Sequence, residues 1–389
     1  MARKAATLDI EAAVRERYEK AARAREKQLC CPAPYDPKYL EVIPLEVLEK
    51  DYGCGDPTRY VRPRDTVLDL GSGAGKICFI AAQIAGPQGR VIGVDFNLEM
   101  LALARKYQPV VAAALGCDNV RFHRARIQDL ALPLEEVDAY LKANPVRSAD
   151  DLRRYEEFQG RLRKGAPVIR DESVDVILSN CVLNLVQEAD REQLFREMFR
   201  VLKRGGRVAI SDIVSDEAVP EAMKQDARLW SGCIAGAFQE AAFLAAFERA
   251  GFHAITLDKY GQQPWKTLRG IQFRSVTVTA RKGKQGPCLE RNQAVIYKGP
   301  WKKVEDDDGH TLVRGRRMAV CDKTYRILTS EPYVSQIVPV APLKEIPLRR
   351  ARPFACGQSA LRSPAETKGR RYRKTENAAA ACAPGSGCC

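Results

Sequence analysis

Short apolar runs alternate with segments of helical period between residues 65 and 281. Seven of these runs are rich in β-branched residues and are predicted to be strands, and they span residues 66–70, 90–95, 120–125, 174–180, 206–213, 253–260 and 273–281. Alternating strands and helices predict an α/β domain with a mostly parallel, seven-stranded sheet. The last two runs are joined by a loop without a long helix, which favours an antiparallel end to the sheet.

The segments before this domain predict a helical extension. Residues 1 to about 29 have an amphipathic pattern typical of one helix, the loop CCPAPYDP follows, and a second helical stretch covers about 41–51. The turn YGCGDP then leads into the main domain. We therefore expect an N-terminal extension over residues 1–60 and a main domain over 61–283.

Two further regions depart from the α/β pattern. Residues 133–170 are charged and helical in pattern, and they are predicted to be an insertion in the main domain. Short β-like runs (AVIYKG, RRMAVC and SQIVPV) predict a small accessory β domain over 284–343. The remaining residues, 344–389, are predicted to be a basic tail without fixed structure that ends in cysteines.

Composition narrows the class of protein. The chain has 389 residues and 45% hydrophobic content, enough for a packed core. No apolar run reaches signal-peptide or membrane-spanning length, so we expect a cytoplasmic protein without a membrane partner. A monomer is the default expectation. The net charge of +14 raises the alternative of a nucleic-acid methyltransferase, but residues 341–376 hold ten Lys/Arg against three Glu, a net of +7. Half of the excess thus lies in the tail, and without an N/D-PP-Y/F motif we expect no nucleic-acid partner.

A glycine-rich loop, VLDLGSGAGK at 67–76, marks a nucleotide site in a Rossmann-like fold. Glycines 71, 73 and 75 let the backbone approach a ligand, and Asp95 ends the next strand, where its carboxylate can accept both ribose hydroxyls. Asp69 stands two residues before the first glycine. A carboxylate there repels phosphates but suits a cationic aminosulfonium nucleoside.

Cysteines surround this loop in sequence. The chain has 13 cysteines, an odd number, and no secretion signal, which favours reduced thiols that serve metals or catalysis. Cys54 lies in a turn, Cys181 follows Asn180 at a strand's carboxyl end, and Cys233 lies in a small-residue segment, WSGCIAGAF, predicted to be helical. All could converge on one cleft. Cysteines without a motif are expected to act as small hydrophobes or exposed thiols: Cys78, Cys117, Cys288, Cys321 and Cys356.

These stretches make the chain resemble the arsenite S-adenosylmethionine methyltransferases. The resemblance covers roughly residues 14–343 and rests on YGCG, VLDLGSG, VIGVD, SNCVLNLV, RVLKRGG, WSGCIAGAF, QFRSVT and NQAVIYKG, with GSGCC at the end. It implies a class I S-adenosylmethionine-dependent fold with a small β-rich C-terminal domain. The Gly loop commonly continues to an Asp in that family, whereas Lys76 stands here.

The resemblance also implies a site and a reaction. Thiolates of Cys54, Cys181 and Cys233 would bind trivalent arsenic, and methyl transfer to arsenite or methylarsenite would follow. Cys30 or Cys31 would then pair with Cys54 in a disulfide, which thioredoxin or glutathione would reduce. No metal cofactor is expected. The residues implied for S-adenosylmethionine are Asp69, Gly71, Ser72, Gly73, Gly75, Asp95, Phe96, Met100, Ile127, Gln128, Asn180 and Val182.

Two alternatives remain open at this point. The same fold could methylate another soft element or a small organic nucleophile, because fold does not fix substrate. The chain could also bind arsenite through three thiols without turnover, although the intact Asp69, Gly71, Gly73 and Asp95 argue against a loss of activity.

Overall fold

The computed structural model describes residues 8–26, 33–356 and 360–369. The chain divides into two compact units, Met1–Gly283 and Lys284–Cys389. Cys30, Cys31 and the three terminal cysteines lie outside the described residues, as does part of the predicted first helix. In the described part of the chain, no helix is both long enough and apolar enough to cross a membrane.

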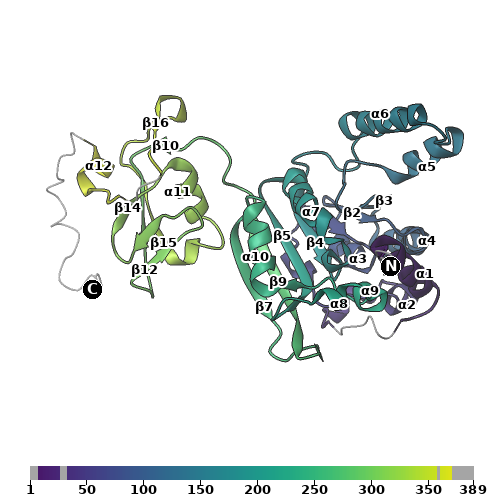
Figure 1. The fold of residues 1–389 in the computed structure, drawn as a ribbon. Coiled ribbons are helices and arrows are strands. Elements are labelled where there is room, and N and C mark those ends of the chain that lie inside the picture. Colours follow the sequence, from purple (N-terminus) through teal and green to yellow (C-terminus); the bar gives the residue numbers. More distant parts are fainter. Residues whose placement is uncertain (1–7, 27–32, 357–359, 370–389) are drawn as a thin grey trace, which may run out of the picture. The chain divides into compact units, whose positions relative to one another are not determined.

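One mixed sheet forms the centre of the first unit (Figure 1). Its strand order within the described residues is β3-β2-β1-β4-β5-β9-β7, and short strands β6 and β8 pair with β5 and β9. Strands β1 to β5 pair in parallel, whereas β9 is antiparallel to both β5 and β7, as predicted. The strands are β1 (Thr66–Leu70), β2 (Arg90–Asp95), β3 (Val120–Arg124), β4 (Val174–Asn180), β5 (Leu202–Ser215), β6 (Phe238–Gln239), β7 (His253–Tyr260), β8 (Lys266–Leu268) and β9 (Ile271–Arg281).

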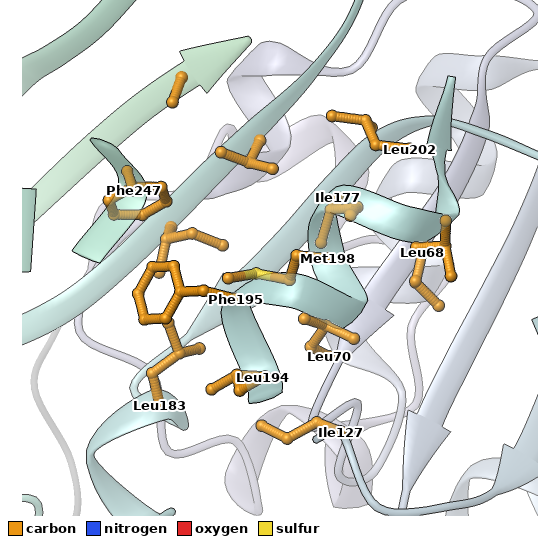
Figure 2. Close-up of a cluster of buried hydrophobic side chains, with 14 of the residues drawn as sticks. Leu68, Leu70, Ile127, Ile177, Leu183, Leu194, Phe195, Met198, Leu202 and Phe247 are labelled. Atoms are coloured by element: carbon orange, nitrogen blue, oxygen red, sulfur yellow. The ribbon is translucent and has the colours of Figure 1, made fainter. Parts of the chain in front are cut away.

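Helices cover both faces of this sheet because alternate strand residues are apolar on both sides. Leu68 and Leu70 of β1 pack with Phe195 and Met198 of α7, as Figure 2 shows, whereas Val67 packs in a second core with α3 and α4. The helices are α1 (Ile10–Arg23), α2 (Leu45–Glu49), α3 (Lys76–Ala85), α4 (Leu98–Leu115), α5 (Leu134–Ala143), α6 (Ala149–Gly165), α7 (Glu188–Val201), α8 (Glu221–Lys224), α9 (Ala227–Ser231) and α10 (Glu240–Arg249). The predicted α/β class is confirmed.

The segment 133–170 is a pair of helices, α5 and α6. The rings of Tyr140 and Phe158 stack with their centroids 4.1 Å apart, so the two helices contact each other through an aromatic pair. Helix α6 has no buried residue, which explains why its sequence is so strongly charged.

The second unit is rich in short strands. The three predicted β-like runs form one sheet in the order β14-β11-β15, and β10 pairs with β16 and β12 with β13. We expected no fixed structure beyond residue 343, but β16 and α12 lie there, which corrects this expectation for 344–356 and 360–369. The elements are β10 (Leu289–Glu290), β11 (Ala294–Tyr297), β12 (Lys303–Glu305), β13 (Thr311–Val313), β14 (Arg317–Ala319), α11 (Asp322–Leu328), β15 (Ile337–Val340), β16 (Arg352–Pro353) and α12 (Pro364–Lys368).

Candidate functional site

A cavity of about 470 Å³ lies at the carboxyl edge of the sheet. Strands β1, β2 and β4 are parallel neighbours, so the residues that follow them meet at one edge. Gly75 does not line the cavity; it precedes α3 with a φ of +93°, and a Cβ there would meet Phe122 at 2.9 Å. The other residues predicted to bind the cofactor all line it: Asp69, Gly71, Ser72, Gly73, Asp95, Phe96, Met100, Ile127, Gln128, Asn180 and Val182.

The glycine-rich loop is tied to strand β2. The backbone N–H groups of Gly71 and Ser72 donate to the Val94 carbonyl at 2.8 and 3.0 Å, and the Gly73 N–H donates to Asp95 Oδ2 at 2.9 Å. A Cβ at Gly71 would lie 2.5 Å from Val182, so only glycine fits, whereas Gly73 faces open space. The loop is therefore rigid and leaves room for a ligand.

Two buried carboxyl groups with raised pKa values, Asp69 and Asp95, line the cavity. Burial raises the pKa of the Asp69 carboxyl to about 7, although the Cys78 thiol donates to its Oδ2 at 3.3 Å. Burial also raises the pKa of Asp95. Nearby, the buried Ser72 hydroxyl has no hydrogen-bond partner within the described residues. Buried polar groups ordinarily have partners. A ligand with a cationic amino group and hydroxyls, such as S-adenosylmethionine, would supply them, so the residues present fit this cofactor.

Helix α1 forms one wall of the cavity, which sequence reasoning missed. Tyr18 of this helix lines the cavity and packs edge-on against Tyr52, with ring centroids 6.1 Å apart. Glu11 accepts two hydrogen bonds from the Arg126 guanidinium at 2.7 and 2.9 Å. The amphipathic pattern predicted the helix, but it carried no signal for the position of the helix over the loop.

Lys76, which departs from the family pattern, lies at the cavity wall. Its ammonium donates to Asp51 Oδ2 at 2.8 Å and lies 3.6 Å from the centre of the Tyr35 ring. This lysine thus ties the start of α3 to the segment before YGCG. Its charge is matched by Asp51.

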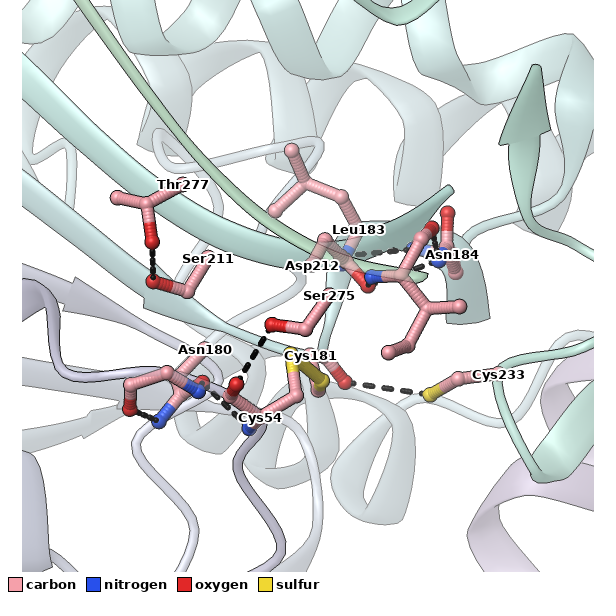
Figure 3. The surroundings of a disulfide bond; sticks show 12 residues. Cys54, Asn180, Cys181, Leu183, Asn184, Ser211, Asp212, Cys233, Ser275 and Thr277 are labelled. Carbon is pink, nitrogen blue, oxygen red and sulfur yellow. Dashed lines mark hydrogen bonds between the residues drawn. A yellow bond between two sulfur atoms is a disulfide. The ribbon is translucent and has the colours of Figure 1, made fainter. Parts of the chain in front are cut away.

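Three cysteines that the sequence singled out lie together beside the cavity (Figure 3). Cys54 and Cys181 form a disulfide with a Cα–Cα distance of 5.9 Å, and Cys233 Sγ donates to the Cys181 carbonyl at 3.4 Å. All three are buried in one apolar cluster, and Cys181 also lines the cavity. We expected Cys54 to pair with Cys30 or Cys31. Cys30 and Cys31 lie outside the described residues, so that pairing stays a prediction, and the disulfide recorded here joins Cys54 to Cys181, which follows the neighbouring strand end.

Two of these cysteines have unusual backbone. Cys181 and Cys233 both have a φ of +59°, a left-handed conformation that costs a non-glycine residue about 1–2 kcal/mol. We predicted that Cys233 lies in a helix, and this prediction is wrong, because α9 ends at Ser231 and Gly232 caps it. Strain of this kind concentrates at functional sites, where it directs a side chain that regular structure would point elsewhere.

Tyr18 of α1 reaches Cys233. Burial raises the pKa of the Tyr18 hydroxyl well above its ordinary value, and the nearby Cys233 thiol raises it further. The cavity and the cysteine cluster therefore share a wall made by one helix.

Asn180 fastens the loop that carries Cys54. Its Oδ1 accepts from the N–H groups of Cys54 and Gly55 at 2.8 and 3.0 Å, and its Nδ2 donates to the Gly55 carbonyl at 2.9 Å. Gly53 is needed for this approach, since a Cβ there would lie 2.0 Å from Asn180 Nδ2. We expected Asn180 to bind the cofactor. It lines the cavity, yet its amide is occupied by the loop.

The buried Asp212 holds the segment after Cys181, which sequence reasoning did not identify. Its carboxylate accepts from the Leu183 N–H at 2.9 Å and from the Asn184 side-chain amide at 2.8 Å. Burial raises its pKa to about 7.

Known proteins are similar to this chain in sequence and in fold. A methyltransferase domain family matches residues 62–165 and 146–251, and a domain of unknown function matches residues 284–372. The arsenite methyltransferase of Aquipseudomonas alcaligenes is 32% identical over 317 residues, which is 77% of this chain and 81% of the relative. The mouse arsenite methyltransferase is 29% identical over 78% of this chain and 74% of its own length.

A solved structure has the same fold. It is an arsenic(III) S-adenosylmethionine methyltransferase from Chlamydomonas reinhardtii, with a TM-score of 0.52 and 24% identity, and the match covers 81% of this chain and 99% of that one.

Proposed function

The chain belongs to the arsenite methyltransferase family and has a class I S-adenosylmethionine-dependent methyltransferase fold, and on this premise we propose that it methylates trivalent arsenic held by its own cysteines. The observation that carries the proposal is the convergence of Cys54, Cys181 and Cys233 beside the cofactor cavity. Thiolates are the ligands that a soft trivalent centre prefers.

The cavity residues divide the work of holding the cofactor. The Asp69 carboxylate would face its cationic groups, Asp95 would accept from the ribose hydroxyls, and the free Ser72 hydroxyl would gain a partner. When bound, S-adenosylmethionine supplies an electrophilic methyl group on a positively charged sulfonium. Helix α1 covers the cavity wall and would exclude water from it.

The substrate would be held at the sulfur atoms. Arsenite would exchange its three hydroxyls for three thiolates and release three waters, which leaves arsenic with one lone pair. The lone pair would attack the methyl carbon, so that an As–C bond forms as the C–S bond breaks and S-adenosylhomocysteine leaves. No general base is required because the nucleophile carries no proton, and the protein contributes positioning.

Methylation oxidises arsenic formally from +3 to +5, and two of its thiolates can return it to +3. The methylated arsenic carries the positive charge of the former sulfonium. Two of its As–S bonds would break, the two sulfurs would join as a disulfide, and arsenic would keep one electron pair. Water would take the vacated position and lose a proton, which leaves neutral trivalent methylarsenic on one sulfur and one hydroxyl. The Cys54–Cys181 bond is a disulfide between two of the proposed ligands, which supports this step. A thiol reductant of the thioredoxin or glutathione class would then supply two electrons and two protons. Before that, the thiolate of Cys30 or Cys31 would attack Cys54 and release Cys181, which gives the pairing with Cys54 that the family resemblance implies.

Arsenic speciation tests the function. Purified protein is incubated with arsenite, S-adenosylmethionine and a thiol, and products are separated and detected by elemental mass. Wild type should form methylated arsenic, and Cys181→Ser should lose at least about a hundredfold in rate because the substrate is misplaced. Cys117 is a free cysteine that is not part of the Cys54–Cys181–Cys233 group, so Cys117→Ser is the matched control and should retain full activity.

Two results would count against the proposal. Tight arsenite binding without methylated product would indicate a binding protein, and full activity of Cys181→Ser would remove that cysteine from the site.

A further inference from the structure

A second group of three cysteines lies in the Lys284–Cys389 unit. The sulfur atoms of Cys288, Cys321 and Cys356 all lie within 4.8 Å of one another, and none of the three is in a disulfide. In sequence they lie far apart and without a motif, so each was interpreted as an isolated thiol. The fold of this unit brings them together.

Two of the three come from one pair of short strands. Cys288 immediately precedes β10 and Cys356 follows β16, and the two strands pair antiparallel, with Leu289 opposite Pro353. The Phe354 N–H also donates to the Cys288 carbonyl at 2.8 Å. The strand pair thus brings together the two segments that carry these cysteines.

The third cysteine comes from the start of α11. Cys321 is fully buried, and its sulfur accepts from the Thr324 N–H at 3.4 Å and lies 3.2 Å from the Thr324 hydroxyl. Cys288 and Cys356 are half-buried. The group is therefore anchored on its buried side and reachable by a small solute from the other.

The three thiols act on one another. Burial raises the pKa of Cys288, but hydrogen bonds with Cys356 and Cys321 and the Lys323 ammonium outweigh burial and lower that pKa below its ordinary value. Burial and the hydrogen bond with Cys288 raise the pKa of Cys356. These interactions agree with the short distances between the three sulfur atoms.

We propose that Cys288, Cys321 and Cys356 form a second binding site for trivalent arsenic, separate from the methylating one. Three ligands bonded to a common ion at about 2.3 Å lie about 4.0 Å apart in a planar arrangement and closer in a pyramidal one, so an approach of about 1 Å closes the observed group around one ion. Three sulfurs complete a three-coordinate centre. A structural zinc ion takes four protein ligands, and the group found among the described residues offers three.

Binding balances without an oxidant or reductant. Arsenite, As(OH)₃, exchanges three As–O bonds for three As–S bonds, and the three thiol protons leave with the hydroxyls as three waters. The choice of arsenic rests on the proposed function, but the site does not depend on turnover. The chain would carry arsenic in a unit that matches a domain of unknown function as well as beside the cofactor.

A variant without the other reactive cysteines isolates the site. Eight cysteines of the full chain are replaced by Ser: Cys30, Cys31, Cys54, Cys181, Cys233, Cys382, Cys388 and Cys389. Cys78, Cys117 and the three cysteines of the proposed site remain. Arsenite is added to the reduced protein, free arsenic is removed, and bound arsenic is counted by elemental mass. We expect about one arsenic per chain, with three sulfur neighbours in its X-ray absorption spectrum.

Matched single substitutions in that background decide the assignment. Cys288→Ser should lower bound arsenic at least about tenfold, and Cys117→Ser, also half-buried, should leave it unchanged. Cys356→Ser should repeat the loss, and circular dichroism and thermal unfolding check that each variant is folded. The proposal is overturned by an arsenic-free background variant, by binding that survives Cys288→Ser, or by zinc held at one per chain that arsenite does not displace.

This test is distinct from that of the proposed function. The background variant lacks Cys54, Cys181 and Cys233 and cannot methylate by the proposed route, so its arsenic content reports on the second site alone. Methylation by wild type reports on the first.

Discussion

The two groups of three cysteines are built in different ways. Beside the cofactor cavity, two of three cysteines have left-handed backbone, and the third lies in a loop that needs a glycine on each side. In the C-terminal unit, none of the three has a positive φ, and paired strands and the start of a helix suffice. The difference teaches that chemistry at a cofactor requires each sulfur to be directed, whereas binding requires only that the sulfurs be close.

Removing the Asn180 side chain should separate the two groups most strongly. Asn180→Ala deletes the acceptor for the N–H groups of Cys54 and Gly55, so the loop loses its position relative to Cys181. We expect the methylation rate to fall about a hundredfold, because a displacement of about 1 Å costs that much. Arsenic bound at Cys288 in the other unit should not change. Rates and bound arsenic are measured on the same preparation.

Asn180→Asp is the control for this substitution. It keeps an oxygen for both N–H groups but cannot donate to the Gly55 carbonyl, so its rate should lie between those of wild type and Asn180→Ala. Equal rates for Asn180→Ala and wild type would mean that the loop keeps its place without the clamp.

Cofactor binding should depend on pH through Asp69, which has no counterpart at the second group. The folded, cofactor-free protein keeps Asp69 protonated up to a pKa of about 7, whereas the unfolded chain ionises it near 3.8. Stability of the cofactor-free protein therefore falls as pH rises from about 4 to 7. A cationic ligand needs the ionised form, so the Kd for S-adenosylmethionine should rise about tenfold per pH unit below 7.

Calorimetry between pH 5.5 and 8 checks this dependence. Asp69→Asn should flatten the slope, although Asp95, whose pKa burial also raises, can keep part of it. Arsenic binding at Cys288, Cys321 and Cys356 should not follow Asp69. A Kd that stays constant across this range in wild type would show that the cofactor does not bind against an ionised Asp69.

Features that depend on local sequence patterns were predicted, whereas contacts between residues far apart in the sequence were mostly not. Strand boundaries were predictable because alternating apolar residues repeat along 66–70 and 174–180, and both segments are strands with these bounds. The convergence of Cys54, Cys181 and Cys233 was expected from strand ends and turns, since parallel strands share a carboxyl edge. The Cys54–Cys181 disulfide was not predictable, because it depends on the distance between these cysteines in the fold, which a sequence does not contain.

The second group of cysteines could not be predicted from the sequence. Cys288, Cys321 and Cys356 share neither a spacing nor a flanking pattern, and β16 lies in a segment expected to lack structure. The role of α1 was missed for the same reason, because a helical pattern states which face is apolar and not what it covers. In each case the missing information was a long-range pairing.

Backbone strain gives a smaller test, in which the order of two substitutions should reverse between the groups. At Cys233, where φ is +59°, Gly should be more stable than Ala by about 1 kcal/mol because Ala keeps the strained Cβ. At Cys288, which has no positive φ, Gly should be less stable than Ala by about 0.5–1 kcal/mol. Urea unfolding of the four variants measures both differences. The same order at both positions would deny that strain distinguishes the groups.

The smallest expected effect is a twofold change in bound arsenic on reduction. With Cys30, Cys31, Cys382, Cys388 and Cys389 replaced by Ser, the Cys54–Cys181 disulfide leaves this group with one thiol, that of Cys233, and one thiol does not complete a three-coordinate ion. Cys288, Cys321 and Cys356 are free thiols and should bind about one arsenic per chain without a reductant. A phosphine reductant should open the first group and raise the content to about two. If bound arsenic stays at one per chain after reduction, only one of the two groups binds it. If no arsenic binds before reduction, the sulfurs of Cys288, Cys321 and Cys356 are also oxidised, and both groups need the reductant.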